Sequence, residues 1–252
     1  HDLEMLGLDP DRVRRWFVAN HGLTFHAYTR LRRLGAALRQ IQLGESVGQA
    51  VLASGYESES GFREAFAQVF GNPPSAVDRE SSIWINRVAT PLGSMIVGVH
   101  DSGLCLLEFA ERRMLDTQLK RLSRHMGRVF LPGEHVLMEA VREQLNAYFD
   151  GSLRSFSLPV QAPGTVFQES VWSALREIPY GETRSYAQVA ETIGQPEAVR
   201  AVGRANGDNR IAIVVPCHRV IGSGGEPVGY GGGVWRKEYL LAMEQAQAFH
   251  LS

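Results

Sequence analysis

The part of this sequence best suited to chemistry is a cysteine followed directly by a histidine and an arginine. Cys217 comes after the apolar run IAIVV (211–215) and Pro216, and His218 and Arg219 follow it. The run is short and β-branched, which predicts a buried strand that Pro216 cannot extend. Cys217 is therefore expected at the edge of a core. If a short helical turn begins there, its free N–H groups would stabilise a thiolate, and His218 could accept the thiol proton directly or through water.

A carboxylate that could orient this histidine lies in the last predicted helix. In VWRKEYLLAMEQA, Glu244 follows Leu240 and Leu241 by four and three residues, which places it on the apolar face. Hydrogen-bonded to His218, it would fix the imidazole tautomer, as the third member of a Cys/His system does. Two simpler readings stay open: a buried, inert cysteine, which is the commoner fate of a lone thiol, and a surface glutamate near a frayed helix end.

A helix, a tight turn and a second helix are predicted upstream of the cysteine, in SYAQVAETIGQPEAVRAVGRANGDN. The first helix has one apolar stripe, formed by Tyr186, Val189, Ala190 and Ile193. Gly194 can adopt the left-handed stop, and Pro196 suits the first turn of the next helix. That helix carries Arg200 and Arg204 on one side among small residues, which would allow a close approach to DNA. A helical hairpin with solvated arginines fits the same pattern.

Composition narrows the class of protein. The chain has 252 residues, 44% of them hydrophobic, and a formal net charge of −1, which excludes the bulk basicity of a protein that coats nucleic acid. Two arginine-rich stretches, 12–39 and 198–219, are nevertheless candidate phosphate-contacting surfaces. No apolar run approaches the ~18 residues of a membrane helix. With only two cysteines, Cys105 (expected in the core) and Cys217, we expect a cytoplasmic protein without a membrane partner or a metal site.

Three segments differ in pattern. Residues 1 to about 80 contain helical patterns and no convincing strand, and GNPPSAVDRESS makes a plausible linker after them. Residues 83–109 show short β-branched runs broken by turn residues, which predicts a small antiparallel sheet. Two helical patterns follow, and from Phe167 onward the chain is predicted to be mostly helical apart from 211–215.

The first segment resembles AraC-type regulators. SVGQAVLASGY and ESESGFREAFAQVFG are similar to their second helix-turn-helix, and LGLDPDRVRRWFVANHGLTFHAYTRLRRLGAA is similar to part of the first, whose opening helix is missing. Glu57 and Glu59 begin the second recognition helix and would repel phosphates, and Asp78 stands where the resemblance implies arginine. The segment could therefore position DNA without reading a promoter.

The rest of the chain, from about 83 to 248, resembles the O6-alkylguanine-DNA alkyltransferases. The resemblance rests on PCHRV, on the glycine loop with Tyr230, on the LLAMEQ helix and on FQESVWSALREIPYGETRSYAQVA. With the AraC-type segment in front, the order resembles the bacterial adaptive-response proteins of the Ada type without their amino-terminal zinc-binding domain. The zinc-ligand cysteines of those proteins are absent from this sequence, so we do not expect transcription to be activated by methylation.

The resemblance implies a multidomain α and α+β fold. It consists of an all-α AraC-like helix-turn-helix segment over 1–80 with the first motif incomplete, a small α/β subdomain of ribonuclease-H type with a three-stranded antiparallel sheet over 83–160, and a mostly helical, winged-helix-like catalytic DNA-binding domain over 161–252. The implied function is DNA repair by direct reversal. The alkyl group of O6-methylguanine, and of O4-methylthymine, would pass irreversibly to Cys217 after base flipping through the minor groove. The implied partner of a monomer is double-stranded DNA with an alkylated base, and the implied cofactor is none.

Five residues carry implied catalytic roles. Cys217 corresponds to the acceptor thiolate, His218 to a base acting through water, and Glu244 to the orienting carboxylate. Tyr186 corresponds to the phenol that contacts the flipped nucleotide and helps protonate the leaving guanine, and Asn209 to an amide that braces the active-site turn.

The implied binding residues fall into two groups. Arg200 would fill the space left by the extruded base, and its helix contributes further DNA contacts from Ala198, Ala201, Gly203 and Arg204. The base pocket would use backbone groups of Cys217 and Val220, together with the loop at Tyr230 and Gly231. Gly231 replaces a residue that often bears a hydroxyl, but the expected contact is through its main-chain N–H.

Two other functions compete with repair. One is an AraC-like transcription regulator whose carboxy-terminal domain senses alkylation or is inactive, although relatives that only bind lesions replace the cysteine. The other is a cysteine hydrolase, which shares the thiol and imidazole but must admit water to an acyl intermediate.

Overall fold

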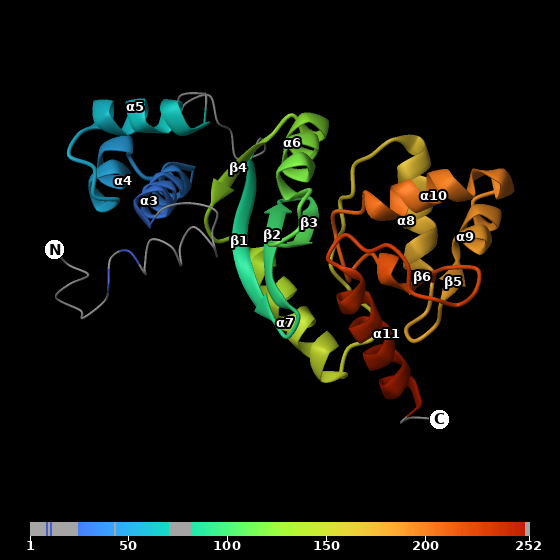
Figure 1. Ribbon diagram of the computed structural model, residues 1–252. Coiled ribbons are helices and arrows are strands. Elements are labelled where there is room, and N and C mark those ends of the chain that lie inside the picture. Colours follow the sequence, from blue (N-terminus) through green and yellow to red (C-terminus); the bar gives the residue numbers. More distant parts are fainter. Residues whose placement is uncertain (1–8, 10, 12–24, 43, 71–81, 250–252) are drawn as a thin grey trace. The chain divides into compact units, whose positions relative to one another are not determined.

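The computed structural model divides the chain into two compact units, His1–Ile85 with Arg128–Glu134, and Asn86–Gly127 with His135–Ser252. It describes residues 9, 11, 25–42, 44–70 and 82–249 (Figure 1). Nearly all of the helix predicted in DPDRVRRWFVAN and nearly all of the proposed linker lie outside these residues. Within them, no helix combines the length and the apolar character needed to cross a membrane.

The described part of the first unit before the sheet is helical, as predicted. It contains α3 (Phe25–Gln42), α4 (Val47–Ala53) and α5 (Glu59–Phe70). The turn between α4 and α5 is held by Arg33 of α3, whose Nε donates to the Ser54 carbonyl at 2.7 Å. Leu34, Phe62 and Phe66 are fully buried, so the three helices share one small apolar core.

The sheet has four strands in the order β3-β2-β1-β4. They are β1 (Ser82–Thr90), β2 (Gly93–His100), β3 (Gly103–Phe109) and β4 (Val129–Pro132). β2 and β3 are antiparallel, but β4 pairs with β1 in parallel. The strands predicted over 83–109 are therefore present as β1, β2 and β3, but the predicted three-stranded antiparallel sheet lacked the fourth, parallel strand. β4 was missed because four residues between two helices are too few to show a strand periodicity, and a parallel partner gives no hairpin signal.

Two helices accompany the sheet. α6 (Leu115–Met126) connects β3 to β4 and ends at Gly127 in the left-handed conformation, and α7 (Val136–Asp150) ends in the same way at Gly151. α7 buries a stripe that contacts β2, with Met138, Val141, Leu145 and Tyr148 as its buried residues. Both stops use glycine because a side chain at these φ values is strained.

The carboxy-terminal helices are α8 (Val166–Arg176), α9 (Tyr186–Thr192), α10 (Val199–Gly207) and α11 (Val234–Phe249). The predicted helix-turn-helix is confirmed. Ser185 and Gln188 form a capping box at the start of α9, Gly194 has φ +71°, and Pro196 opens a short 3₁₀ turn before α10. A small parallel sheet, β5 (Arg184–Ser185) with β6 (Val220–Ile221), lies beside α9.

The run 211–215 is not the predicted strand. Ile211 alone pairs, by an isolated bridge with Leu107 of β3, and the chain then turns at 212–214 with Ile213 at φ +72°. All five residues are buried. Their β-branched, apolar composition therefore reflects burial of a turn, which periodicity does not separate from a short buried strand.

Candidate active site

Cys217 begins a single 3₁₀ turn, Cys217–Arg219, and this cysteine is only 6% exposed. Its own N–H donates to the Val215 carbonyl at 2.8 Å, and the N–H of Arg219 donates to the Pro216 carbonyl at 2.9 Å. Burial raises the pKa of the Cys217 thiol to about 11, although a hydrogen bond from Asn209 opposes this. Two of the N–H groups expected to be free in this turn are thus already bonded, and burial favours the neutral thiol.

Asn209 braces the turn that carries the thiol. Its Nδ2 donates to the Val215 carbonyl at 2.9 Å and to the Cys217 Sγ at 3.1 Å, and its Oδ1 accepts from the Ile211 N–H at 3.0 Å. The residue is 3% exposed. One buried amide thus fixes both ends of the 211–217 turn and contacts the sulfur.

His218 and Glu244 are both fully buried and lie in contact. The distance from His218 Nε2 to Glu244 Oε1 is 2.9 Å, whereas His218 Nδ1 is buried without a hydrogen-bond partner in the described structure. Burial lowers the pKa of His218 despite the opposing effect of Glu244. The imidazole is accordingly neutral, with its proton on Nε2 and with Nδ1 able to accept another.

The carboxylate of Glu244 accepts more bonds than the sequence predicted. Arg219 donates to both of its oxygens at 2.9 Å, the Tyr148 hydroxyl donates at 2.6 Å, and the Gly181 N–H donates at 3.1 Å. Burial alone would raise the pKa of Glu244, but the donors from His218 and Arg219 hold it well below its usual range. Glu244 is therefore ionised and fixed in place behind His218.

Two arginines of the predicted phosphate-contacting stretch 198–219 are in the interior. Arg210 and Arg219 are 4% and 6% exposed. Arg210 donates to the Gln118 side chain at 3.0 Å and to the Pro163 carbonyl at 2.6 Å, and Arg219 is bound to Glu244. That part of the prediction is wrong, because each side chain has buried acceptors that the local sequence does not reveal.

The other two arginines of this stretch, Arg200 and Arg204, are exposed on α10. This helix has no acidic residue in its first turn. It is held by Trp172, whose Nε1 donates to the Ala205 carbonyl at 2.8 Å. The small residues named with them also belong to this region, with Ala201 and Gly203 in α10 and Ala198 in the preceding 3₁₀ turn.

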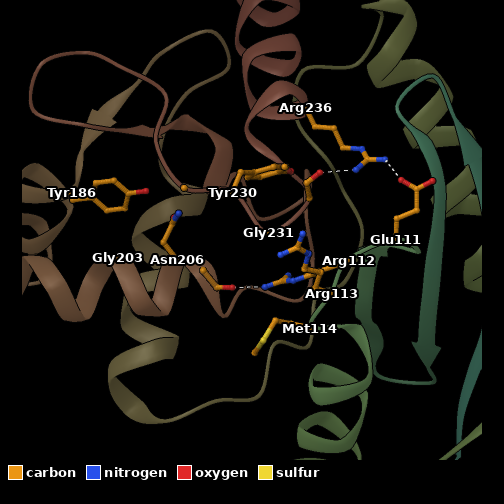
Figure 2. Close-up of a pocket in the computed structure, with 14 residues that line it drawn as sticks. Glu111, Arg112, Arg113, Met114, Tyr186, Gly203, Asn206, Tyr230, Gly231 and Arg236 are labelled. Atoms are coloured by element: carbon orange, nitrogen blue, oxygen red, sulfur yellow. Dashed lines mark hydrogen bonds and ion pairs between the residues drawn. The ribbon is translucent and has the colours of Figure 1, made fainter.

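A pocket of about 620 Å³ opens beside α10 (Figure 2). Among the residues predicted for the site, Tyr186, Gly203, Tyr230 and Gly231 line it. Cys217, His218 and Val220 do not line it, but the Cys217 carbonyl accepts a hydrogen bond at 3.3 Å from Nδ2 of Asn206, a lining residue. The backbone of Cys217 thus lies against a residue that lines the pocket.

The two tyrosines of the pocket are protonated phenols. Burial raises the pKa of Tyr186 and raises that of Tyr230 well above its usual value, and a charge on Cys217 would raise both further. The Tyr186 hydroxyl donates to the Val228 carbonyl at 3.2 Å. The Tyr186 proton is therefore engaged with the loop, whereas the buried Tyr230 hydroxyl has no hydrogen-bond partner in the described structure.

Lys237 is a buried cation that the sequence did not point to. Its side chain is fully buried, and Nζ donates to the carbonyls of Val220 and Val228, the latter at 2.7 Å. Burial lowers the pKa of Lys237 to about 8. The ammonium ties the loop that carries Tyr230 to the strand after the thiol, and it also occupies the carbonyl of Val220, a residue whose backbone groups were expected to contact the base. No local signal marked Lys237, because lysine near a helix start normally indicates a solvated residue.

Family comparisons cover nearly the whole chain. Residues 86–162 match the 6-O-methylguanine DNA methyltransferase, ribonuclease-like domain, and residues 166–246 match the DNA binding domain of the same proteins. Residues 3–80 match a helix-turn-helix domain. Together with the Cys217 site, these matches define a DNA alkyltransferase preceded by a helix-turn-helix segment.

Curated relatives agree. The methylated-DNA–protein-cysteine methyltransferase of Mycobacterium tuberculosis is 47% identical over 166 residues, which are 66% of this chain and 94% of the relative. That of Methanosarcina barkeri is 45% identical over 163 residues, 65% of this chain and 98% of the relative. A crystal structure of Mycobacterium tuberculosis OGT in complex with DNA has 42% identity and a TM-score of 0.57, with 66% of this chain and 94% of that chain covered. The chain belongs to the methylated-DNA–protein-cysteine methyltransferase family, and it is a DNA-binding repair alkyltransferase.

Proposed function

We propose that this protein removes the alkyl group from O6-methylguanine, and from O4-methylthymine, in double-stranded DNA by transferring it to Cys217 in one irreversible step. The observation that carries the proposal is the chain of contacts from Asn209 to the Cys217 sulfur and from His218 to Glu244, placed beside a pocket lined by Tyr186 and Tyr230. We also propose that the protein acts as a monomer.

The proposed reaction begins with a protonated thiol. The base is flipped through the minor groove into the pocket, and Arg200 of α10 fills the space that it leaves. Ala198, Ala201 and Gly203 allow the helix to approach closely, and Arg204 contacts a phosphate. The main-chain N–H of Gly231 contacts O6, and the backbone of Cys217 and Val220 faces the guanine edge.

The thiol proton then passes through a water molecule to Nδ1 of His218, which Glu244 holds in the correct tautomer. The sulfur forms a bond to the methyl carbon as the C–O6 bond breaks, and the leaving guanine takes a proton with the help of Tyr186. The net reaction moves the thiol proton to the base and leaves S-methylcysteine. Because a thioether cannot be hydrolysed here, each polypeptide reacts once.

We propose that each of the three segments forms a domain with its own role. We assign the helix-turn-helix to 1–80, the sheet subdomain to 83–160 and the catalytic, DNA-binding domain to 161–252. A regulator with an inactive carboxy-terminal domain is not favoured, because the thiol, imidazole and carboxylate are all present, with Asn209 bonded to the sulfur and His218 bonded to Glu244.

The test uses a duplex with a single O6-methylguanine. After incubation with one equivalent of protein, the peptide that contains Cys217 should gain the mass of one methylene group, and Cys217→Ser should bind the duplex with unchanged affinity but transfer nothing. An unmodified Cys217 peptide despite DNA binding would favour a regulator. Several turnovers per polypeptide would favour a hydrolase.

A further inference from the structure

Gln118 of α6 is a fully buried amide that contacts both sequence neighbours of Asn209. Its Oε1 accepts from Nε of Arg210 at 3.0 Å, and its Nε2 donates to the Asp208 carbonyl at 3.5 Å. One side chain thus uses its acceptor on one flank of Asn209 and its donor on the other. The residue between the two flanks, Asn209, is the one whose Nδ2 donates to the Cys217 sulfur at 3.1 Å.

The flank at Asp208 has two further partners. Its carboxylate accepts from Arg121 of α6 at 2.8 Å and from Gln168 of α8 at 3.0 Å. The side chains of Asp208 and Arg121 are 28% and 41% exposed, so solvent weakens this ion pair. The contact between Gln118 and Arg210 is buried on both sides, and a buried polar contact is costly to break. Gln118 is therefore the stronger constraint on the turn 208–210.

The position of Asn209 matters to the sulfur because the transfer needs a thiolate. Burial raises the pKa of the Cys217 thiol to about 11, and the hydrogen bond from Asn209 acts in the opposite direction. A donor stabilises a charged sulfur only at hydrogen-bond distance and angle, and the interaction weakens steeply when the geometry is lost. Movement of the turn 208–210 would thus disfavour the thiolate without removing any group that contacts it.

We propose that Gln118 is a positioning residue for alkyl transfer, which holds the turn 208–210 so that the Asn209 amide stays bonded to the Cys217 sulfur while the thiolate forms. The inference rests on the proposed function. Gln118 contacts neither the base nor the sulfur, and it acts through Asn209. Since α6 belongs to the segment 83–160, the sheet subdomain then contributes to the chemistry at Cys217 through this one side chain.

The test uses Gln118→Leu, which removes both hydrogen bonds of the amide at similar side-chain volume. The single-turnover rate constant for transfer from a duplex with one O6-methylguanine should fall about 10-fold, as expected for one lost hydrogen bond to a charged group. The affinity for the duplex should change by less than about 2-fold, because the exposed arginines of α10 are untouched. Fluorescence anisotropy measures this affinity.

A second measurement needs no DNA. Modification of Cys217 by iodoacetamide at about pH 8 proceeds through the thiolate fraction, so its rate should also fall about 10-fold in Gln118→Leu. A substitution that merely loosened the fold would expose the thiol and raise this rate. An unchanged or higher rate in the folded variant would therefore overturn the role of Gln118.

Gln144→Leu on α7 is the matched control. This amide also holds a loop with both ends, since its Nε2 donates to Oγ of Ser157 and its Oε1 accepts from the Ser157 N–H, each at 2.9 Å. No contact links it to the turn 208–210 within the described residues. Both rates should stay within about 2-fold of wild type, and losses equal to those of Gln118→Leu would reduce the proposal to a general effect on stability.

A double-mutant cycle tests whether Gln118 acts through Asn209. In an Asn209→Ala background, Gln118→Leu should lower the two rates by less than a further 2-fold or so, because the amide that it positions is gone. A full additional 10-fold loss would overturn the proposal. If Asn209→Ala does not fold, the iodoacetamide comparison in the native background still decides.

Gln118→Glu replaces Gln118→Leu if the latter does not fold. It keeps an acceptor for Arg210 and loses the donor to the Asp208 carbonyl, so both rates should fall by a smaller factor, about 3-fold. Rates equal to wild type in this variant would overturn the role of Gln118. Wild-type protein that transfers no methyl group from the duplex would instead overturn the proposed function, because the iodoacetamide comparison does not depend on it.

Discussion

The helices α3–α5 and the carboxy-terminal helices α8–α11 both contain a helix-turn-helix, but they place their charges differently. In α5, Glu59 pairs with Arg63, and the two side chains are 47% and 61% exposed. In α11, Glu244 is fully buried and is bound by His218 and Arg219. The first region keeps this pair at its surface, whereas the second places a charged network in its core.

This difference distinguishes charge pairs that contribute to the stability of the fold from charge pairs that position catalytic groups. An exposed pair four residues apart on a helix contributes about 0.3–0.5 kcal/mol. A buried pair often contributes no more than a well-packed apolar replacement would, yet removing one partner costs about 3–5 kcal/mol. The buried network is thus a poor way to stabilise a fold but an effective way to fix His218 beside the thiol. The predictions below test this contrast.

The largest effect is expected on folding. Glu244→Ala leaves Arg219 buried without its counter-charge and should lower the free energy of unfolding by about 3–5 kcal/mol. Glu59→Ala, the matched change at the surface, should lower it by less than about 0.5 kcal/mol. Urea unfolding of both variants measures the difference. Equal losses would show that Glu244 is no more important to the fold than a surface glutamate.

The second prediction concerns how the reactivity of the Cys217 thiol depends on pH. Burial raises the pKa of Cys217 to about 11 and lowers that of His218, so the resting site holds a neutral thiol and a neutral imidazole. The rate of Cys217 modification by iodoacetamide should therefore rise about tenfold per pH unit between about pH 7 and pH 9, with the thiolate fraction. Peptide mapping follows the reaction, with N-acetylcysteine as an exposed reference.

The reference thiol should level off near its ordinary pKa, about 8.5, whereas Cys217 should not. A Cys217 rate that is already flat at neutral pH would indicate a stable thiolate–imidazolium pair. That result would contradict the neutral resting state and restore the helix-turn stabilisation expected from the sequence.

Local signals were enough to predict much of this arrangement. The helix-turn-helix before Cys217 follows from one apolar stripe, a glycine stop and a proline start, each within a few residues. The burial of Glu244 was indicated by a carboxylate on an apolar helix face, whereas its pairing with His218, 26 positions away, was a hypothesis from the chemistry of Cys/His systems. The first two signals use physical rules that act over one or two helical turns.

The features that were missed depend on contacts between distant residues. Tyr148 reaches Glu244 across 96 positions of sequence, and Arg210 finds its acceptor Gln118 across 92. An arginine in isolation indicates a solvated surface, and only the folded chain shows which acceptors desolvate it. β4 was missed for the same reason, because its partner strand β1 is separated from it in the sequence by β2, β3 and α6.

The smallest expected effect is on DNA binding, and it compares the two recognition helices, α10 and α5. Arg200→Ala on α10 should weaken binding to duplex DNA and slow transfer from it by about 10-fold, because it removes an exposed cation and the proposed wedge of base flipping. Arg63→Ala on α5 removes a cation that is already paired with Glu59 and should change binding by less than about 2-fold. Fluorescence anisotropy and single-turnover transfer measure both.

Free O6-methylguanine base distinguishes the reason for the loss. This substrate needs no flipping, so Arg200→Ala should react with it at the wild-type rate, which would place the defect in DNA handling and leave the Cys217 site intact. An equal loss with the free base would mean that Arg200 supports the site itself. A larger loss from Arg63→Ala than from Arg200→Ala would reverse the comparison and assign DNA contact mainly to the amino-terminal helices.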